Sequence, residues 1–301
     1  MKKLVIAGGT GFLGTELIKH FGLTYDEIVI LTRQHKPSYG KIKYVQWDAK
    51  NFGDWRLDLE NATAVINLCG KSVDCRYTEK NKAEIFASRL DSTSIIGKAI
   101  EKCISPPLLW INGASATIYQ HSENNPMTEA YGIIGSGFSV EVCKAWEKVF
   151  NSYKLQNTRK INMRISMVMG KTGGVFPALK NVVQKRLGGT MGNGTQQISW
   201  IHITDFCEMI EWFITNTSTS GIYNCVAPKP VRNKTLMTLL RKKLNIKIGE
   251  PANKWMLKIG ALLLGTETEL ILKSRYSYPE RALNEGFHFK YETIEQCLNT
   301  L

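Results

Sequence analysis

Residues 8–14 read Gly-Gly-Thr-Gly-Phe-Leu-Gly and directly follow a short apolar run, which predicts a buried strand. After them, apolar side chains recur at helical spacing over 12–21, which predicts a helix. Gly8 permits the tight turn, Gly11 lets the backbone approach phosphates, and Gly14 lets the helix pack against the strand. The amide groups that open such a helix attract an anion. This turn predicts a pyrophosphate site for a dinucleotide rather than an ordinary glycine-rich turn, with contacts from Gly8, Thr10, Gly11, Phe12, Leu13 and Gly14.

A second buried strand is expected over 27–31 and ends at Thr32 and Arg33. In a dinucleotide-binding fold the end of the second strand faces the adenosine ribose, where an acidic residue selects NAD and an arginine accommodates the 2′-phosphate of NADP. No Asp or Glu stands at this strand end, and His35 and Lys36 add further donors. The sequence therefore predicts a preference for NADP(H). The alternative is that Arg33 is only a solvated loop charge.

Strands and helices alternate along the first part of the chain. The expected strands are 3–7, 27–31, 42–46, 64–68, 107–112 and 160–168, and the expected helices are 12–21, 79–102 and 138–154. This alternation predicts an α/β fold with a Rossmann-type doubly wound parallel sheet.

After residue 170 the pattern is less regular. Short strands are expected at 198–202 and 221–225, and helices at 204–216, 233–245 and 253–265. We expect a smaller C-terminal α/β lobe that closes over the nicotinamide end of the cofactor. The expected division is a dinucleotide-binding domain over 1–170, with contributions from about 200–225, and a substrate lobe over 171–301 that includes a C-terminal helical segment at 250–301.

Composition and charge favour some classes of function over others. The chain has 301 residues and a net charge of +13, but its lysines are spread along the sequence and no nucleic-acid-binding motif accompanies them. A basic, solvated surface that attracts anionic ligands is therefore expected, with DNA or lipid binding as the alternative.

The apolar run at 259–264 is too short to span a membrane, and the histidines lack metal-ligand spacing. The seven cysteines are scattered and no signal peptide is recognised, so we expect a cytoplasmic protein with reduced thiols, no metal, and a small anionic or sugar-like substrate.

Several further motifs occur in a fixed order along the chain. They are Asn67-Leu68-Cys69-Gly70, Ser88-Arg89, Ala114-Ser115-Ala116-Thr117-Ile118-Tyr119, Cys143-x-x-Trp146-Glu147, Ser199-Trp200-Ile201-His202, Ala227-Pro228-x-Pro230-Val231 and Gly286-Phe287-His288-Phe289. Together they resemble the extended short-chain dehydrogenases/reductases. Within that superfamily they are similar to an atypical group of NADP-binding, epimerase-like proteins, some labelled cell-division inhibitors, that end in a small domain. The resemblance runs end to end and implies an NADP(H)-dependent oxidoreductase or epimerase-like enzyme.

The resemblance also implies roles for single residues. Ser115 falls where the catalytic hydroxyl sits in that superfamily, and Met167 lies where a loop touches the nicotinamide. Arg89 is expected to reach the adenosine or the diphosphate, with a solvated helix charge as the alternative. Independently of the resemblance, Glu84, five residues earlier, is expected to contact the adenine or ribose. The turn beside the adenosine half of the cofactor is expected to consist of Leu68, Cys69 and Gly70.

Hydride transfer in this superfamily normally uses a Tyr-x-x-x-Lys pair, in which the lysine lowers the pKa of the tyrosine. If Glu147 marks the acidic position after this motif, Ser139 stands at the tyrosine position and Cys143 at the lysine position. The one literal match in the chain, Tyr39 to Lys43, falls on the adenosine side and is treated as coincidence.

Two hypotheses follow from this departure. In the first, Ser115 holds a substrate carbonyl and Tyr119 is the acid, with His202 or Lys144 as further candidates. In the second, the chemistry is lost and the protein binds NADP(H) as a regulator or redox sensor.

Two polar residues have structural interpretations. Arg164 lies on a predicted core strand and is expected to pair with an acid, because a buried unpaired arginine is too costly. Asp205 is expected to be the N-cap of the helix that follows it. The glycine-rich segment 188–194 is either a flap over the site or a plain loop.

Overall fold

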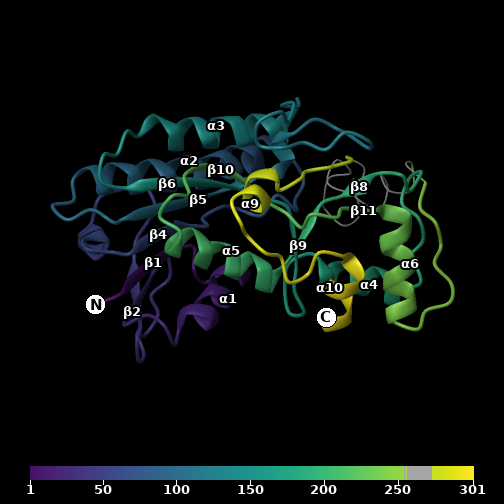
Figure 1. Cartoon of the computed structure of the whole chain (residues 1–301), viewed down its shortest axis with the longest axis horizontal. Helices are drawn as coiled ribbons and strands as arrows, with labels where there is room; N and C mark the ends of the chain where they lie inside the picture. Colours follow the sequence, from purple (N-terminus) through teal and green to yellow (C-terminus); the bar gives the residue numbers. More distant parts are fainter. Residues whose placement is uncertain (254, 256–272) are drawn as a thin grey trace.

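The computed structural model describes residues 1–253, 255 and 273–301 and has a seven-stranded sheet at its centre (Figure 1). In spatial order its strands are β10 (Gly221–Cys225), β6 (Arg159–Ile165), β5 (Leu109–Ser115), β4 (Ala64–Asn67), β1 (Lys3–Ala7), β2 (Glu27–Thr32) and β3 (Ile42–Gln46). Every neighbouring pair is parallel. The expectation of a Rossmann-type doubly wound α/β fold is confirmed.

Both faces of the sheet are buried beneath helices. Successive side chains of each strand point to opposite faces, so each strand contributes to both core clusters. In β1, Leu4 and Ile6 join one core cluster, whereas Val5 and Ala7 join the other. Figure 1 shows helices on both sides of the sheet. The helices are α2 (Glu79–Glu101) and α3 (Phe138–Ser152) on the Val5 face, and α1 (Phe12–Phe21) and α5 (Ile203–Thr215) on the Leu4 face.

The strand order reverses between β1 and β4, which pair side by side although β2 and β3 intervene in the sequence. The helices that follow these two strands, α1 and α2, lie on opposite faces of the sheet. In open α/β sheets this switch point opens a crevice at the carboxyl ends of the strands, where ligands bind. The fold therefore places the glycine turn after β1 and the turn after β4 together.

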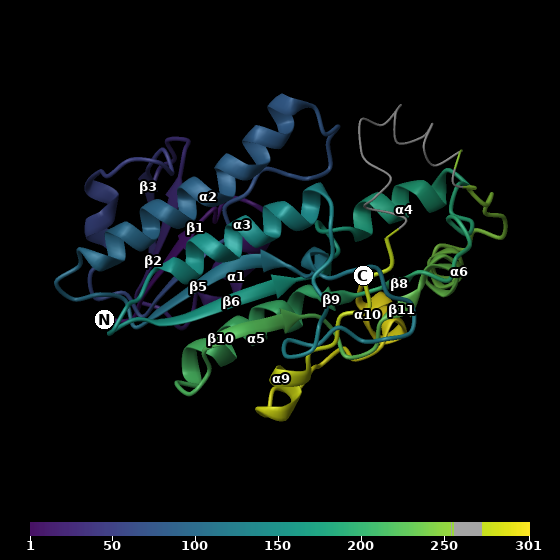
Figure 2. The ribbon, with the colours of Figure 1, turned by 90° about the horizontal axis from the view of Figure 1, so that it is seen from above.

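A second group of elements lies beyond the carboxyl ends of the strands, at the right of Figure 2. Its core cluster includes Trp200, Leu236, Leu240 and Cys297. Its elements are β7 (Met167–Met169), α4 (Phe176–Gln184), β8 (Gln197–Ile198), β9 (Trp200–His202), β11 (Val231–Arg232), α6 (Asn233–Lys243) and α10 (Ile294–Thr300).

The expected division into two domains stays a prediction. β10 completes the large sheet and α5 covers it, as the expected contribution from about 200–225 requires. The segment after α9 (Glu280–Asn284) also returns to the large sheet layer, because Phe287 and Phe289 join the cluster beneath α5.

Two expected strands are each divided in the structure. The strand expected at 160–168 is interrupted at Ser166, whose N–H donates to the Cys225 carbonyl, and β7 then pairs with β9 in a separate small sheet. The strand expected at 198–202 is divided at Ser199, because β8 pairs with β11 and β9 pairs with β7. Periodicity does not reveal a change of pairing partner within one apolar run. The helix expected at 253–265 lies almost wholly outside the described residues.

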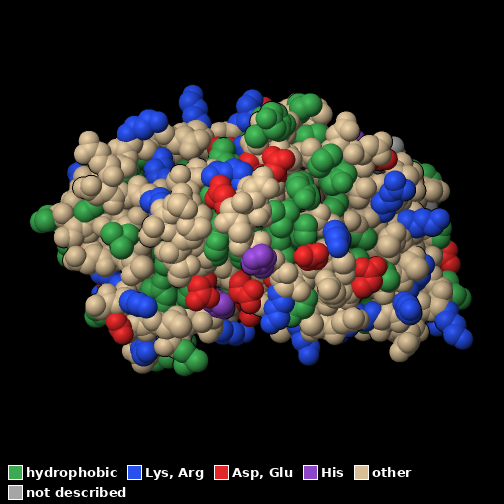
Figure 3. All heavy atoms as spheres, viewed as in Figure 1, with side chains coloured by type: hydrophobic (Ala, Val, Ile, Leu, Met, Phe, Trp, Pro, Cys, Tyr) green, Lys and Arg blue, Asp and Glu red, His purple; other side chains and the backbone are tan. Residues whose placement is uncertain are grey.

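The described part of the chain contains no helix with the length and apolar character needed to cross a membrane. Within the same residues, no group of three His, Cys, Asp or Glu side chains is arranged to hold a metal ion. On the face drawn in Figure 3, Lys and Arg side chains are scattered over the surface with acidic side chains among them. This face therefore carries no single continuous basic patch.

Asp205 is not the N-cap of α5, which corrects the expectation from the sequence. His202 caps the helix instead, because its Nδ1 accepts the N–H of Thr204 at 3.1 Å. The Asp205 carboxylate lies inside the first turn and accepts the N–H groups of Lys290 at 2.8 Å and Tyr291 at 3.1 Å. Asp205 therefore fastens the C-terminal segment to α5.

The buried His202 generates a pH prediction. Burial lowers the pKa of His202 to about 4, and Lys290 adds to the lowering. Because Nδ1 accepts a hydrogen bond, the neutral ring carries its proton on Nε2 and donates it to Thr300 Oγ1 at 3.1 Å. An unfolded histidine titrates near pH ~6.5, so the unfolded chain binds more protons and stability falls as the pH drops from about 6.5 towards 4.

We expect His202→Asn, which keeps an acceptor at the N-cap, to remove this acid sensitivity. Between pH 7 and pH 4.5 the urea unfolding free energy of the wild type should fall by about 2 kcal/mol more than that of the variant. Burial raises the pKa of Asp205 to about 6, which acts in the opposite direction but in both proteins. Equal pH dependence in the two proteins would contradict the assignment.

Candidate functional site

The glycine turn after β1 is in direct contact with the turn after β4. Gly8 has a φ of +78°, and a Cβ built on it would lie 3.0 Å from the Leu68 carbonyl and 3.1 Å from the Cys69 nitrogen. A side chain at this position is therefore excluded both by backbone conformation and by space. A Cβ on Gly14 would lie 2.3 Å from the Gly9 Cα, so the close approach of helix and turn depends on this glycine as well.

The start of α1 is open to an anion. Thr10 and Gly11 are exposed, and Gly11 is an N-cap without a side-chain hydrogen bond to the helix. The first i to i−4 bond of the helix runs from the Thr15 N–H to the Gly11 carbonyl at 2.9 Å, so the amides of Phe12 and Leu13 precede it. Unpaired amides at the positive end of a helix dipole bind phosphate. These residues fit the pyrophosphate of a dinucleotide.

We call the turn and helix start formed by residues 8–13 the cradle, and the Phe12 ring supports it from one side. This ring fills the space next to Gly170 and Gly173, where added Cβ atoms would lie 2.4 Å and 2.2 Å from it. The loop after β7 therefore packs directly on the first residue of α1. The spacing of Gly170 and Gly173 in the sequence is the signal from which this contact could have been found.

The end of β2 brings Arg33 close to the same turns. Thr32 is buried and its Oγ1 accepts the N–H of Gln34 at 3.3 Å, whereas Arg33 is exposed. Burial raises the pKa of the Cys69 thiol to about 12, and the nearby Arg33 guanidinium opposes this rise. Arg33 therefore lies close enough to the turn after β4 to act on Cys69, and its contact with a 2′-phosphate stays a prediction.

Arg89 lies beneath the turn after β4 and is not a solvated helix charge. Its Nη1 donates to the carbonyl groups of Lys71 at 3.0 Å and Ile85 at 3.2 Å. A Cβ on Gly70 would lie 3.1 Å from the guanidinium carbon, so the backbone of this turn rests on Arg89. Whether Arg89 also reaches the cofactor stays a prediction.

Glu84 is occupied by an ion pair in this structure. Its carboxylate pairs with Lys71, which holds the pKa of Glu84 below its ordinary value, and its side chain is 45% exposed. Lys71 Nζ also donates to Asn81 Oδ1 at 2.8 Å. A contact of Glu84 with adenine or ribose stays a prediction.

Ser115 ends β5 at the carboxyl edge of the sheet. Its Oγ accepts the N–H of Thr117 at 3.2 Å and caps the short helix η2 (Ala116–Ile118). A hydroxyl that accepts a hydrogen bond still has its own proton to donate, so Ser115 is able to bind a carbonyl oxygen. Met167 begins β7 and is half-buried, and its contact with the nicotinamide stays a prediction.

The expectation that Tyr119 is the acid that meets a substrate is wrong. Its side chain is 1% exposed, and its hydroxyl lies 2.8 Å from Asn224 Oδ1, 3.1 Å from the Thr128 carbonyl and 2.8 Å from Arg164 Nη1. Burial is the main cause that raises the pKa of Tyr119. The turn of η2 carries this residue back into the protein interior, which the motif alone does not reveal.

The other proton-transfer candidates also have structural roles. His202 is the buried N-cap of α5, and Lys144 forms an exposed ion pair with Glu141 at 3.0 Å. The expectation that Arg164 pairs with an acid is confirmed, because its Nε and Nη2 each donate to the buried Glu147 carboxylate at 2.8 Å. A bidentate pair of this kind holds Arg164 in one geometry.

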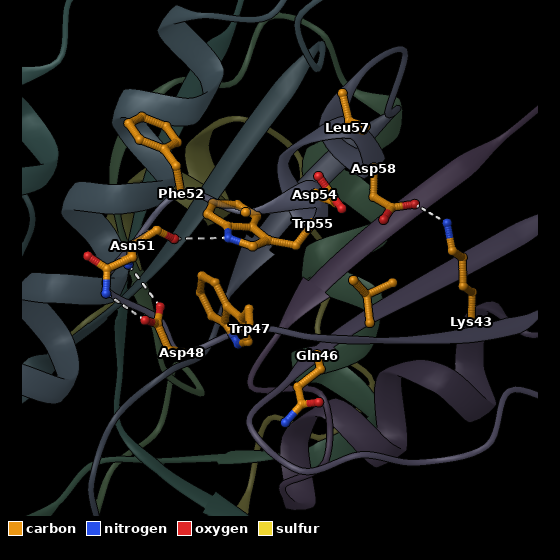
Figure 4. Close-up of a pocket in the computed structure, with 12 residues that line it drawn as sticks. Lys43, Gln46, Trp47, Asp48, Asn51, Phe52, Asp54, Trp55, Leu57 and Asp58 are labelled. Carbon is orange, nitrogen blue, oxygen red and sulfur yellow. Dashed lines mark hydrogen bonds and ion pairs between the residues drawn. The ribbon is translucent and has the colours of Figure 1, made fainter.

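One cavity, of about 680 Å³, lies at the outer edge strand β3 (Figure 4). The rings of Trp47 and Trp55 stack edge to face with centroids 5.1 Å apart, and Lys43 pairs with Asp58 at 2.5 Å. None of the described residues expected to hold a cofactor lines it. This cavity is therefore separate from the crevice at the switch point.

A second cavity, of about 590 Å³, lies between the segment after η2 and the start of α3. Its charged and titratable lining groups are His121 and Lys273. No motif in the sequence points to Lys273, because this residue is far from Ser115 along the chain. The same holds for Tyr77, whose hydroxyl lies 3.3 Å from Ser139 Oγ.

The buried network around Tyr119 generates a stability prediction. Tyr119→Phe leaves polar groups of Arg164 and Asn224 without their shared partner, so the unfolding free energy should fall by about 1–3 kcal/mol. The affinity for NADPH should change less than about twofold, because the hydroxyl lies outside the crevice. Tyr131→Phe is the control, since Tyr131 is 84% exposed. Full stability of Tyr119→Phe together with lost NADPH affinity would contradict this account.

Comparison with known proteins agrees with this architecture. A family described as the NAD dependent epimerase/dehydratase family matches residues 4–225, and a domain of unknown function, DUF1731, matches residues 253–301. An epimerase family protein of Staphylococcus epidermidis is 29% identical over 303 residues, covering 100% of this chain and 99% of the relative.

Solved structures are similar over nearly the whole chain. The human epimerase family protein SDR39U1, solved with NADPH, has a TM-score of 0.87 and 25% identity, covering 99% of this chain and 98% of that protein. MoeE5 in complex with UDP-glucuronic acid and NAD shares the fold at a TM-score of 0.77 and 15% identity, with coverage of 99% and 97%. Because the family match covers well over half of its residues, this chain belongs to the NAD dependent epimerase/dehydratase family.

Proposed function

We propose that this protein is an NADP(H)-dependent oxidoreductase or epimerase-like enzyme that acts on a small sugar-like or anionic molecule. The observation that carries the proposal is the open cradle at the switch point. There the Gly8 turn abuts Leu68 and Cys69, and the amides of Phe12 and Leu13 precede the first helical hydrogen bond. Arg33 stands beside this cradle with no acidic residue at the strand end, which favours NADP over NAD.

In this proposal different residues at the switch point bind different parts of the cofactor. Gly8, Gly11 and the first turn of α1 hold the pyrophosphate, and Arg33 meets the 2′-phosphate. The turn after β4 flanks the adenosine half, and Ser115 and Met167 lie towards the nicotinamide. When bound, the nicotinamide gives or takes a hydride at a substrate carbon. Similarity to human SDR39U1, whose structure contains NADPH, supports this assignment.

The substrate site is proposed for the cavity between the segment after η2 and the start of α3. Lys273 and His121 line it, and a cation favours a carboxylate or phosphate group on the substrate. A relative of the same fold, MoeE5, is described with UDP-glucuronic acid. A sugar-like substrate that carries negative charge is therefore the class we favour.

One observation favours a second candidate function, a non-catalytic NADP(H)-binding regulator or redox sensor. Helix α3 carries Ser139 and Cys143 at the positions that the resemblance assigns to the tyrosine and lysine. Burial raises the pKa of Cys143 to about 11, so this thiol is neutral and does not replace an ammonium group. In this alternative the cradle binds the cofactor and no reaction follows.

Cofactor selectivity tests the cradle and Arg33. By titration calorimetry we expect NADPH to bind at least about tenfold more tightly than NADH, because hydrogen bonds to a charged group contribute about 1.5–3 kcal/mol. Arg33→Ala should remove most of this preference and leave NADH affinity unchanged. Arg56→Ala, which removes the same charge from the exposed side of the helix η1 (Asp54–Leu59), is the control. A preference for NADPH that survives in Arg33→Ala would contradict the role of Arg33.

Turnover separates the two candidate functions. The assay is NADPH oxidation with a panel of UDP-sugars, aldehydes and ketones. Ser115→Ala should lower kcat by about 100-fold on any active compound, because it removes a donor to the reacting oxygen. Tight NADPH binding without turnover across the panel would favour the regulator, and unchanged kcat in Ser115→Ala would exclude Ser115 from the reaction.

A further inference from the structure

A tyrosine from another part of the chain meets α3 where the expected catalytic tyrosine is missing. Tyr77 belongs to the segment before α2, and its hydroxyl lies 3.3 Å from the Oγ of Ser139 on α3. Resting on the proposed function, we propose that Tyr77 supplies the hydroxyl that moves the substrate proton in this enzyme, with Arg89 as the fixed cation beside it.

The ring of Tyr77 is positioned by packing between α2 and α3. It contacts the ring of Phe138 with centroids 4.6 Å apart, and Phe138 in turn contacts Phe86 of α2 at 5.7 Å. Phe138 and Ser139 are the first two residues of α3, so both contacts hold Tyr77 at the N-terminal end of this helix. Aromatic pairs in this edge-on or tilted arrangement stabilise one ring orientation. Tyr77 is half-buried, whereas Tyr119 is 1% exposed.

Arg89 is a cation near both Tyr77 and Cys143, the residue at the position of the missing lysine. Its guanidinium lies 5.2 Å from the centroid of the Trp146 ring of α3 and supports Gly70 from below. Burial lowers the pKa of Arg89, whereas the nearby Cys143 and Tyr77 raise it, which places both groups in its surroundings. An arginine stays charged in proteins, and a nearby cation favours the phenolate form of a tyrosine.

Several other charged side chains lie near Phe138 or Cys143 of α3. Lys82 lies 5.8 Å from the centroid of the Phe138 ring, and Lys273 and Arg275 lie near enough to Cys143 to lower the pKa of its thiol. Glu147 opposes them by raising the pKa of Cys143, but its carboxylate is engaged by Arg164. Among the charged groups that act on the pKa of Cys143, cations therefore outnumber acids.

The proposed step balances in both directions. When a substrate carbonyl carbon receives a hydride from NADPH, the electron pair of its C=O bond moves to the oxygen, and the Tyr77 hydroxyl donates its proton there. The products are an alcohol, NADP⁺ and the Tyr77 phenolate, which takes a proton back from water. In the oxidative direction the phenolate removes the proton from the substrate hydroxyl as the hydride leaves for NADP⁺. Ser139 orients the Tyr77 hydroxyl, and Arg89 stabilises the phenolate.

The test measures the titration of Tyr77 directly in the full chain. The protein is labelled with tyrosine carrying carbon-13 at Cζ, and its NMR signals are followed from pH 6 to pH 11. The Tyr77 signal is assigned by its loss in Tyr77→Phe and, independently, by its shift in Ser139→Ala. We expect Tyr77 to titrate at least about one pH unit below the exposed Tyr131, which is assigned by Tyr131→Phe. Arg89→Gln should raise the Tyr77 value by about one unit, and Arg89→Lys should keep it low.

Activity and binding supply the second readout. Tyr77→Phe should leave the Kd for NADPH within about twofold and lower kcat on any active compound of the panel by about 100-fold. Tyr77 titrating with or above Tyr131 would overturn this inference while leaving NADPH binding intact. Absence of NADPH binding by calorimetry would overturn the proposed function, and with it this inference.

Discussion

The site depends on one contact, in which the turn after β1 lies against the turn after β4. Gly8 approaches Leu68 and Cys69 so closely that a Cβ added to it would lie 3.0 Å from the Leu68 carbonyl. The contact exists because β1 and β4 pair as neighbours at the point where the strand order reverses. It brings the open amides of α1, the exposed Arg33 and the Arg89-supported Gly70 to one edge of the sheet. Each of these groups depends on the same register between two parallel strands.

Features that follow from steric limits, burial or the cost of a buried charge are predictable from the sequence. The glycine turn is predictable because Gly8 and Gly14 meet steric limits that other residues do not satisfy. The strands of the large sheet are predictable because burial on both faces requires continuous apolar runs. The pairing of Arg164 is predictable because an unpaired buried charge costs several kcal/mol, roughly 3–5.

The remaining features depend on long-range contacts that no motif encodes. Tyr119 lies in a motif typical of this superfamily, yet Asn224 of β10 and Arg164 of β6 enclose its hydroxyl. Asp205 has the residue type of an N-cap, but its carboxylate binds a segment eighty-five residues later along the chain. Ser166 and Ser199 divide apolar runs because the pairing strand changes there. In each case a distant part of the chain decides the role of the residue.

A crystal structure of the protein with NADPH tests the assignment of the cofactor site most directly. We predict that the diphosphate oxygens lie within hydrogen-bond distance of the amides of Phe12 and Leu13, with the adenosine 2′-phosphate against Arg33. An empty glycine turn in crystals that hold NADPH elsewhere would contradict it, as would a turn closed by side chains.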